Sequence, residues 1–88
     1  MVTDVEIKEQ LKKEVSNQAE IPVEDIDENV HLADLGIDSL QALQLLVMLE
    51  RTFKVSIGDQ ELQRFTTITN ISSLVLERIA QASAASVA

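Results

Sequence analysis

The run from Leu40 to Phe53 constrains the fold most, because it carries two apolar stripes. On a helix that turns about 100° per residue, the two stripes lie on nearly opposite sides. The first has the i, i+3, i+4, i+7 spacing of a core-facing surface and comprises Ala42, Leu45, Leu46, Leu49 and Phe53. The second comprises Leu40, Leu43 and Val47, and it is bordered by Gln44, Glu50 and Arg51. In a chain this short, a second stripe indicates a surface that another molecule contacts.

The length of 88 residues allows one domain with a modest core. A domain of this size buries only about 60% of the surface that its unfolded chain exposes, so it has no room for an enclosed catalytic cavity as well. The hydrophobic content of 45% is typical of a globular chain. Because two phenylalanines are the only aromatic residues, the core must consist mainly of Leu, Ile and Val side chains.

The acidic balance and the lack of cysteine exclude several functions. A net charge of -8 opposes binding to nucleic acid and to anionic membranes, and it favours a protein partner with a basic patch. Without cysteine, the chain has no disulfide framework, no thiolate nucleophile and no thiolate metal site. No segment has the pattern of a signal peptide or the length of a membrane span, so we expect a cytoplasmic location.

The first helix is predicted from Thr3 to about Asn17. Thr3 and Glu6 have the spacing of a capping box, in which each side chain satisfies a backbone N–H group at the helix start. Three apolar residues follow at steps of i+4 and predict one buried stripe: Ile7, Leu11 and Val15. The charged side chains on the rest of this helix are predicted to face solvent: Lys8, Lys12, Lys13 and Glu14.

A long loop is predicted over residues 18–35, because Pro22 interrupts the helical period. Its apolar side chains are spread among acidic residues: Ile21, Val23, Ile26, Val30, Leu32 and Leu35. A long loop with regularly placed apolar residues is usually pinned across a helix bundle. We therefore expect this loop to lie on the core.

The second helix is predicted to begin after Asp38 and to end near Phe53. Asp38 is a good N-cap, and Gln41 at the third position completes a capping box. Gly36 supplies backbone freedom at the bend before it. Beyond Phe53, the segment Val55-Ser56-Ile57-Gly58 favours extended or turn conformations.

The last third of the chain predicts one short and one long helix. Residues 59–64 form the short helix, with Leu62 and Phe65 facing inward. Thr67 or Thr69 caps the last helix, whose inner face is Ile71, Leu74, Val75 and Ile79. The predicted fold is all-α, a four-helix bundle with three long helices and one short, over residues 1–82. Residues 83–88 have little to pack against and are predicted to be a disordered tail.

The sequence does not predict an enzyme. Ser39 would need a neighbouring base and an oxyanion hole to act as a nucleophile. The window from Gly36 to Leu40 lacks the second glycine of a nucleophile elbow. The one histidine, His31, stands alone in an acidic loop, which is typical of a surface residue.

A calcium loop is also excluded. Asp25, Asp27 and Asn29 alternate as EF-hand ligands do. However, Val30 stands where the loop needs glycine, and Gly36 stands where it needs a bidentate glutamate. The acidic residues are better explained as solvation of the loop.

Ser39 has a second interpretation that needs no catalysis. Because Asp38 already caps the helix, Ser39 is predicted at the first helical position with its hydroxyl outward. The helix N-terminus favours a phosphate group, and the second apolar stripe begins at the next residue, Leu40. The simpler alternative is that Ser39 is an ordinary helix-start residue.

The stretch Asp34-Leu35-Gly36-Ile37-Asp38-Ser39-Leu40 closely resembles the phosphopantetheine attachment site of acyl carrier proteins. The resemblance extends across nearly the whole chain, from the first helix to Ile79. It includes the segments Ile21-Pro22, Ile26-Asp27 and Thr66-Thr67-Ile68. A site motif in the correct place of a four-helix pattern is a much stronger signal than the heptapeptide alone.

The resemblance implies that a phosphopantetheinyl transferase joins 4'-phosphopantetheine from coenzyme A to the Ser39 hydroxyl, with Gly36, Asp38 and Leu40 around the site. The thiol of this cofactor then carries acyl groups as thioesters, which accounts for a chain without cysteine. The implied partners are acyltransferase and ketosynthase-type enzymes. They would rest on Leu40, Leu43 and Val47, while Asp38 and Glu50 meet basic side chains, and the carrier is expected to be a monomer.

Three positions depart from the fatty-acid type of carrier. Gln41, Gln44 and Arg51 stand where those carriers commonly have acidic residues. This departure favours a carrier of polyketide or related specialised biosynthesis. The alternatives are a fatty-acid carrier, an aminoacyl or peptidyl carrier, and a helical adaptor that is never modified. Met1 and the short tail are typical of a free-standing protein, although a domain excised from a larger synthase would look the same.

Overall fold

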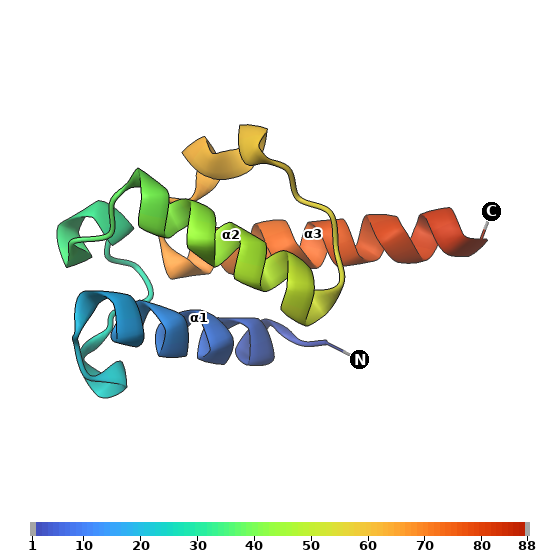
Figure 1. Ribbon diagram of the computed structural model, residues 1–88. Helices are drawn as coiled ribbons and strands as arrows, with labels where there is room; N and C mark the ends of the chain where they lie inside the picture. Colours follow the sequence, from blue (N-terminus) through green and yellow to red (C-terminus); the bar gives the residue numbers. More distant parts are fainter. Residues whose placement is uncertain (1, 88) are drawn as a thin grey trace.

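Three long helices form the frame of the molecule (Figure 1). The computed structural model describes residues 2–87, and the side chains of residues 2–81. The helices are α1 (Asp4–Ala19), α2 (Ser39–Phe53) and α3 (Ile68–Val87). Three short 3-10 segments connect them: η1 (Val23–Asp25), η2 (Leu32–Leu35) and η3 (Asp59–Arg64). With no strand over residues 2–87, the all-α bundle is confirmed, and η3 is its short fourth helix.

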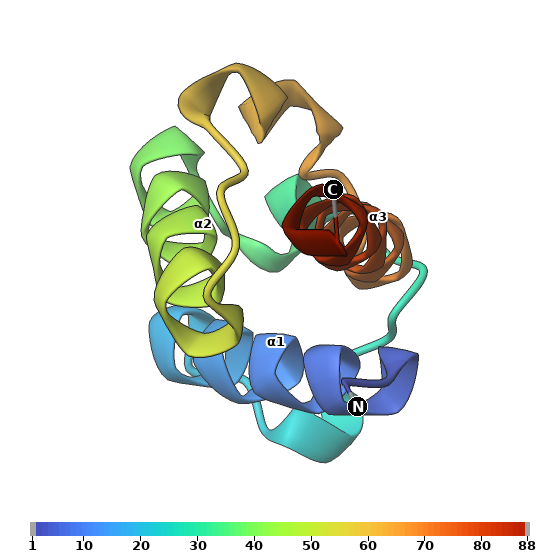
Figure 2. The same cartoon turned by 90° about the vertical axis from the view of Figure 1, so that its right-hand side faces the viewer.

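The core lies between the three long helices, which surround it in the end view (Figure 2). α1 packs against both α2 and α3, and η3 lies against α2. Most predicted core residues of α1 and α3 are fully buried: Ile7, Leu11, Val15, Ile71, Leu74 and Val75. Ile79, also predicted on the inner face of α3, packs on the core but is only partly buried. On α2, three members of the inward stripe are buried: Leu45, Leu46 and Leu49. Ala42 and Phe53, at its two ends, pack on the core but are only partly buried.

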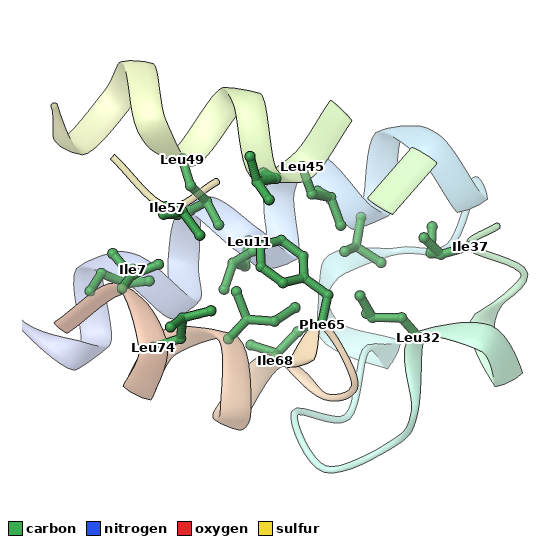
Figure 3. Close-up of a cluster of buried hydrophobic side chains, with 14 of the residues drawn as sticks. Ile7, Leu11, Leu32, Ile37, Leu45, Leu49, Ile57, Phe65, Ile68 and Leu74 are labelled. Atoms are coloured by element: carbon green, nitrogen blue, oxygen red, sulfur yellow. The ribbon is translucent and has the colours of Figure 1, made fainter. Parts of the chain in front are cut away.

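Phe65, the residue directly after η3, lies within this core (Figure 3). It is 5% exposed, and Ile57, from the segment after α2, is 1% exposed. The inward prediction for Phe65 is confirmed, and Leu62 packs on the same cluster in a partly buried position. The predicted bounds of the short helix are also confirmed, although its turns are 3-10 rather than α.

The helix ends show where local chemistry predicts well. At the start of α1, the Thr3 Oγ1 atom accepts a hydrogen bond from the Glu6 N–H at 3.3 Å, so one half of the predicted capping box is present. α1 continues two residues beyond Asn17 and ends at Ala19, and the cap residue Glu20 has a left-handed backbone (φ 58°). α2 ends at Phe53 as predicted, and Lys54 adopts the same left-handed conformation (φ 55°).

The loop between α1 and α2 is pinned to the core, as predicted. Ile26 and Leu32 are buried, whereas Val23 is 42% exposed. Two backbone hydrogen bonds fasten the loop to the start of α3: the Leu32 N–H donates to the Thr66 carbonyl at 2.7 Å, and the Thr69 N–H donates to the Glu28 carbonyl at 3.2 Å. The loop is therefore held by the burial of Ile26 and Leu32 and by backbone hydrogen bonds at Glu28 and Leu32.

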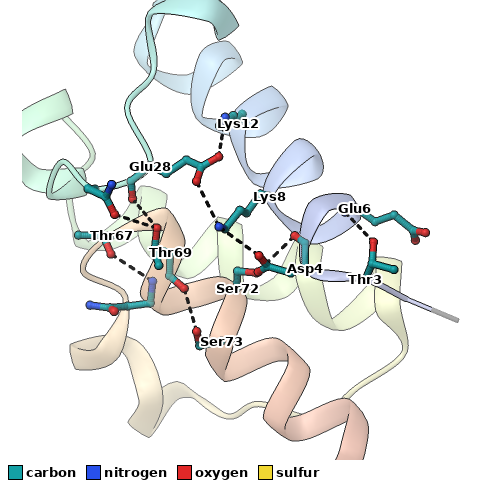
Figure 4. A network of polar contacts seen from close by, with 12 residues as sticks. Thr3, Asp4, Glu6, Lys8, Lys12, Glu28, Thr67, Thr69, Ser72 and Ser73 are labelled. Atoms are coloured by element: carbon teal, nitrogen blue, oxygen red, sulfur yellow. Dashed lines mark hydrogen bonds and ion pairs between the residues drawn. The ribbon is translucent and has the colours of Figure 1, made fainter.

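A polar network adds a third attachment for this loop (Figure 4). The Glu28 carboxylate pairs with Lys8 at 3.2 Å and with Lys12 at 2.8 Å. Lys8 also pairs with Asp4 at 3.1 Å, and Asp4 accepts a hydrogen bond from the fully buried Ser72 of α3. The prediction that Lys8 and Lys12 face solvent is thus wrong, because both lysine side chains bind this loop.

Thr67 caps α3. Its Oγ1 atom accepts a hydrogen bond from the Asn70 N–H at 3.1 Å, whereas the Thr69 hydroxyl donates to the Glu28 carbonyl. The predicted disordered tail, residues 83–88, stays a prediction, because Ala88 and the side chains of residues 82–87 lie outside the described residues. Within residues 2–87, no helix is both long enough and apolar enough to cross a membrane.

Candidate functional site

The start of α2 is fixed by a complete capping box. The Asp38 Oδ1 atom accepts from the Gln41 N–H at 2.8 Å, and the Gln41 Oε1 atom accepts from the Asp38 N–H at 3.0 Å. The Gln41 side chain also donates to the Gln18 carbonyl at the end of α1, at 3.5 Å. These bonds place Ser39 at the first helical position, as the sequence predicts.

Ser39 presents its hydroxyl to solvent. The residue is exposed, and within the described side chains its Oγ atom forms no hydrogen bond, because Asp38 does the capping. The first backbone N–H groups of α2 and the helix dipole favour negative charge here. The position therefore suits a covalently attached, negatively charged group such as a phosphodiester.

Gly36 makes the turn that leads into α2. Its backbone is left-handed (φ 88°), and its N–H donates to the Ala33 carbonyl at 3.1 Å as η2 ends. An added Cβ atom would meet nothing within 4 Å, so glycine is needed for its backbone conformation and not for space. The next residue, Ile37, is buried and anchors the chain just before the cap.

A cavity of about 290 Å³ lies beside Ser39. Its walls come from η2, the first turn of α2 and the end of η3: His31, Leu32, Ala33, Ile37, Asp38, Ser39, Ala42, Leu62, Gln63 and Phe65. Sequence reasoning missed this cavity because the wall from the end of η3 lies about 20 residues or more along the chain from the other walls. Most of the lining is apolar, so a group attached at Ser39 can lie against it.

The outward stripe of α2 is only partly exposed. Leu40 is 65% exposed and Val47 is 37% exposed, whereas Leu43 is in an intermediate position. Gln44 and Arg51, which border the stripe, are exposed. The two stripes therefore differ in burial as predicted, and the exposed one begins directly after Ser39.

Glu50 has a different environment from the one predicted. Its Oε2 atom accepts hydrogen bonds from the backbone N–H groups of Ile57 at 2.8 Å and Gly58 at 3.2 Å. The carboxylate thus fastens the segment after α2 instead of pointing freely outward. Sequence reasoning missed this role because it depends on where the chain returns after the helix.

Comparison with known proteins assigns the chain to a family. A family described as "Phosphopantetheine attachment site" matches residues 9–75, which is well over half of the chain. This chain is an acyl carrier protein by family. Members of this family carry covalently attached 4'-phosphopantetheine and are carriers, not catalysts, so both predictions are confirmed. They interact with a phosphopantetheinyl transferase and with biosynthetic enzymes.

Two relatives illustrate the range of the acyl carrier protein family. The chain is 43% identical over 68 residues to the non-reducing polyketide synthase pkbA of Emericella nidulans, and these aligned residues make up 77% of this chain and 3% of the synthase. It is 45% identical over 47 residues to the acyl carrier protein of Phytoplasma australiense, and these aligned residues make up 53% of this chain and 62% of that protein. The chain thus spans less than two thirds of the length of either relative.

Two solved structures share the fold. The NMR structure of the HMG-ACPI domain from the CurA module of Lyngbya majuscula has a TM-score of 0.74 at 21% identity, over 91% of this chain and 82% of that one. The crystal structure of an acyl carrier protein from Thermotoga maritima has a TM-score of 0.68 at 23% identity, over 85% of this chain and 92% of that one. At these identities the likeness supports the helical fold alone.

Proposed function

We propose that Ser39 is the residue that carries 4'-phosphopantetheine, and that this acyl carrier protein serves polyketide or related specialised biosynthesis. One observation carries the first half: an exposed serine hydroxyl at the first position of a helix that another residue already caps. When bound, the cofactor supplies a thiol that holds acyl groups as thioesters. The chain itself presents the attachment point and the surface around it.

The residues around Ser39 have distinct tasks in this proposal. Asp38 fixes the start of α2 through its bond to the Gln41 N–H, and Gly36 makes the turn that brings the chain there. Leu40, the most exposed residue of the outward stripe, lies beside the attachment point. A transferase that reaches Ser39 would therefore contact Leu40 first.

The proposed partner surface consists of Leu40, Leu43 and Val47, with Gln44 and Arg51 at its border. Its apolar part is small, which suits contacts that form and break quickly, because a carrier must leave each enzyme to reach the next. Glu50 supports this surface indirectly, because its carboxylate accepts hydrogen bonds from the Ile57 and Gly58 N–H groups and so holds the segment after α2 in place.

The polyketide assignment is supported by the charges of α2. Gln44 and Arg51 are exposed, so the helix shows neutral and basic groups where acidic ones would attract basic enzymes. Gln41 does not take part in this surface, because its side chain is used in the capping box and at Gln18. The similarity to a polyketide synthase extends over more of this chain than the similarity to the Phytoplasma carrier.

A cytoplasmic location stays a prediction.

Attachment at Ser39 is tested by intact mass spectrometry after incubation with coenzyme A and a broad-specificity phosphopantetheinyl transferase. We expect the protein to gain one phosphopantetheine and Ser39→Ala to gain none. Because Ser39 is exposed, Ser39→Ala should keep the helical circular dichroism of the parent. No mass gain with a transferase that modifies another carrier would reject the attachment and favour a helical adaptor.

The pathway is tested by malonyl transfer to the holo protein. We expect the malonyl transferase of fatty-acid synthesis to load the parent protein slowly. The double variant Gln44→Glu, Arg51→Glu should be loaded several-fold faster, because the added acidic side chains attract a basic enzyme surface. Lys13→Glu, an exposed charge reversal on α1, is the matched control and should change little. Rapid loading of the parent protein would favour a fatty-acid carrier. Loading with an activated amino acid would favour a peptidyl carrier.

A further inference from the structure

His31 lies on the same cavity as Ser39, although sequence reasoning left it without a role. It is an exposed residue directly before η2, the segment that leads to Gly36 and α2. Among the residues that line this cavity, His31 is the one whose side chain can become positively charged. Asp38 is the other titratable side chain of the lining, and Gln63 is neutral.

The hydrogen bonding of His31 determines which ring nitrogen carries its hydrogen. The Nδ1 atom accepts from the Ala33 N–H at 3.3 Å and so caps η2. In the neutral ring, one nitrogen accepts while the other carries the hydrogen, so the hydrogen must be on Nε2. Within the described side chains, Nε2 has no hydrogen-bond acceptor. The ring therefore keeps one N–H group for an external acceptor.

We propose that the Nε2–H group of His31 donates a hydrogen bond to a phosphate oxygen of the cofactor on Ser39, an inference that rests on the attachment proposed above. The phosphodiester would be bonded directly to the Ser39 Oγ atom, so its oxygens would lie at the cavity that Ser39 and His31 both line. Its negative charge makes it a stronger acceptor than the neutral amides further along the cofactor. His31 is thus a positioning residue that orients the attached group.

The charges near His31 support this role. The Asp38 carboxylate accepts from the Gln41 N–H, and Asp34 is an exposed carboxylate on η2. Both carboxylates repel a phosphodiester, and neither can donate a hydrogen bond to it in the ionised form. His31 is therefore the lining residue best suited to hold a negative group near Ser39, through the Nε2–H group of its neutral ring.

The variant His31→Asn separates this role from capping. An asparagine Oδ1 atom can accept the Ala33 N–H, because asparagine is among the best N-cap residues. The shorter side chain has no counterpart of Nε2. The variant should therefore keep η2 and the cavity wall while it loses the donor to the phosphate.

Phosphorus NMR of the holo protein tests the proposal. We expect the phosphodiester resonance of holo His31→Asn to be displaced from that of the holo parent protein at the same pH, because the variant lacks the donor to the phosphate oxygen. Holo Lys13→Glu, an exposed charge change on α1, is the control and should leave this resonance unchanged.

Nitrogen NMR of the apo protein adds an independent check. The neutral ring of His31 should be the Nε2–H tautomer, and an Nδ1–H tautomer would overturn the proposal. A phosphorus resonance at the same position in the holo parent protein and in holo His31→Asn would overturn it as well. If mass spectrometry places the cofactor on Ser39 in those cases, only the role of His31 fails. If no cofactor attaches, both proposals fail.

Discussion

Leu40 and Leu49 show how position on α2 decides what one kind of side chain does. Leu49 is fully buried, whereas Leu40 is 65% exposed. The stripe pattern predicted this difference, and the spacing of Asp38 and Gln41 predicted the capping box, because both depend on residues within a few helical turns. The sequence did not predict the hydrogen bonds that Glu50 accepts from Ile57 and Gly58, which depend on the path of the chain beyond the helix.

At the residue scale, we predict opposite effects for two identical substitutions on α2. Leu49→Glu should unfold the domain, because it buries a charge without a partner. Leu40→Glu should change the free energy of unfolding by only about 0.5 kcal/mol, as expected for an exposed position, but should slow modification by the transferase several-fold. Urea denaturation and the modification rate measure the two effects. Unfolding of both variants would show that the outward assignment of Leu40 is wrong.

At the scale of elements, the loop between α1 and α2 is held by contacts of two kinds. The burial of Ile26 and Leu32 follows from their apolar side chains, and the sequence pattern predicted that the loop lies on the core. The ion pairs of Glu28 with Lys8 and Lys12 were not predictable, because they join residues 16 and 20 positions apart that only the packed fold brings together. The cavity beside Ser39 escaped prediction for the same reason.

The pH dependence of stability tests these ion pairs. The ammonium groups of Lys12 and Lys8 hold the pKa of the Glu28 carboxyl below its ordinary value. A hydrogen bond from Ser72 and the pairing with Lys8 likewise lower the pKa of Asp4. A carboxyl group whose pKa is lowered by folding stabilises the fold fully at any pH above its pKa in the unfolded chain, which is about 4 for these acids. This stabilisation is lost as the pH falls through the pKa of the group in the folded protein.

We therefore expect Glu28→Gln to be less stable than the parent protein at neutral pH, with a difference that shrinks as the pH falls below about 4. Urea denaturation at a series of pH values measures this difference. Glu24→Gln is the matched control, since it removes the same charge from an exposed position of the same loop. An equal pH response in both variants would show that the Glu28 pairs contribute nothing.

At the scale of the whole molecule, the sign of the net charge differs from the sign of the charge on the partner surface. The chain carries a net charge of -8, but Gln44 and Arg51 make the exposed side of α2 neutral to basic. The molecule measures 43 × 25 × 19 Å. At an ionic strength of about 0.01 M the screening length is about 30 Å, so a partner experiences nearly all charges together, whereas at 0.15 M it is about 8 Å and only nearby charges act.

Salt should therefore weaken the approach of a basic transferase. We expect the second-order rate of modification at Ser39 to fall several-fold between about 0.01 M and 0.15 M salt, because the long-range attraction is screened. The turnover at saturating carrier should change little. A rate that does not depend on salt would show that net charge has no part in recognition, and that the apolar stripe alone directs binding.

The left-handed residues at the two helix ends have a consequence for engineering. Glu20 and Lys54 hold a conformation that costs most side chains about 1 kcal/mol or more, and that glycine adopts freely. Both positions lie away from the residues that line the Ser39 cavity. Glu20→Gly and Lys54→Gly are therefore the first substitutions to try when a more heat-stable form of this carrier is needed.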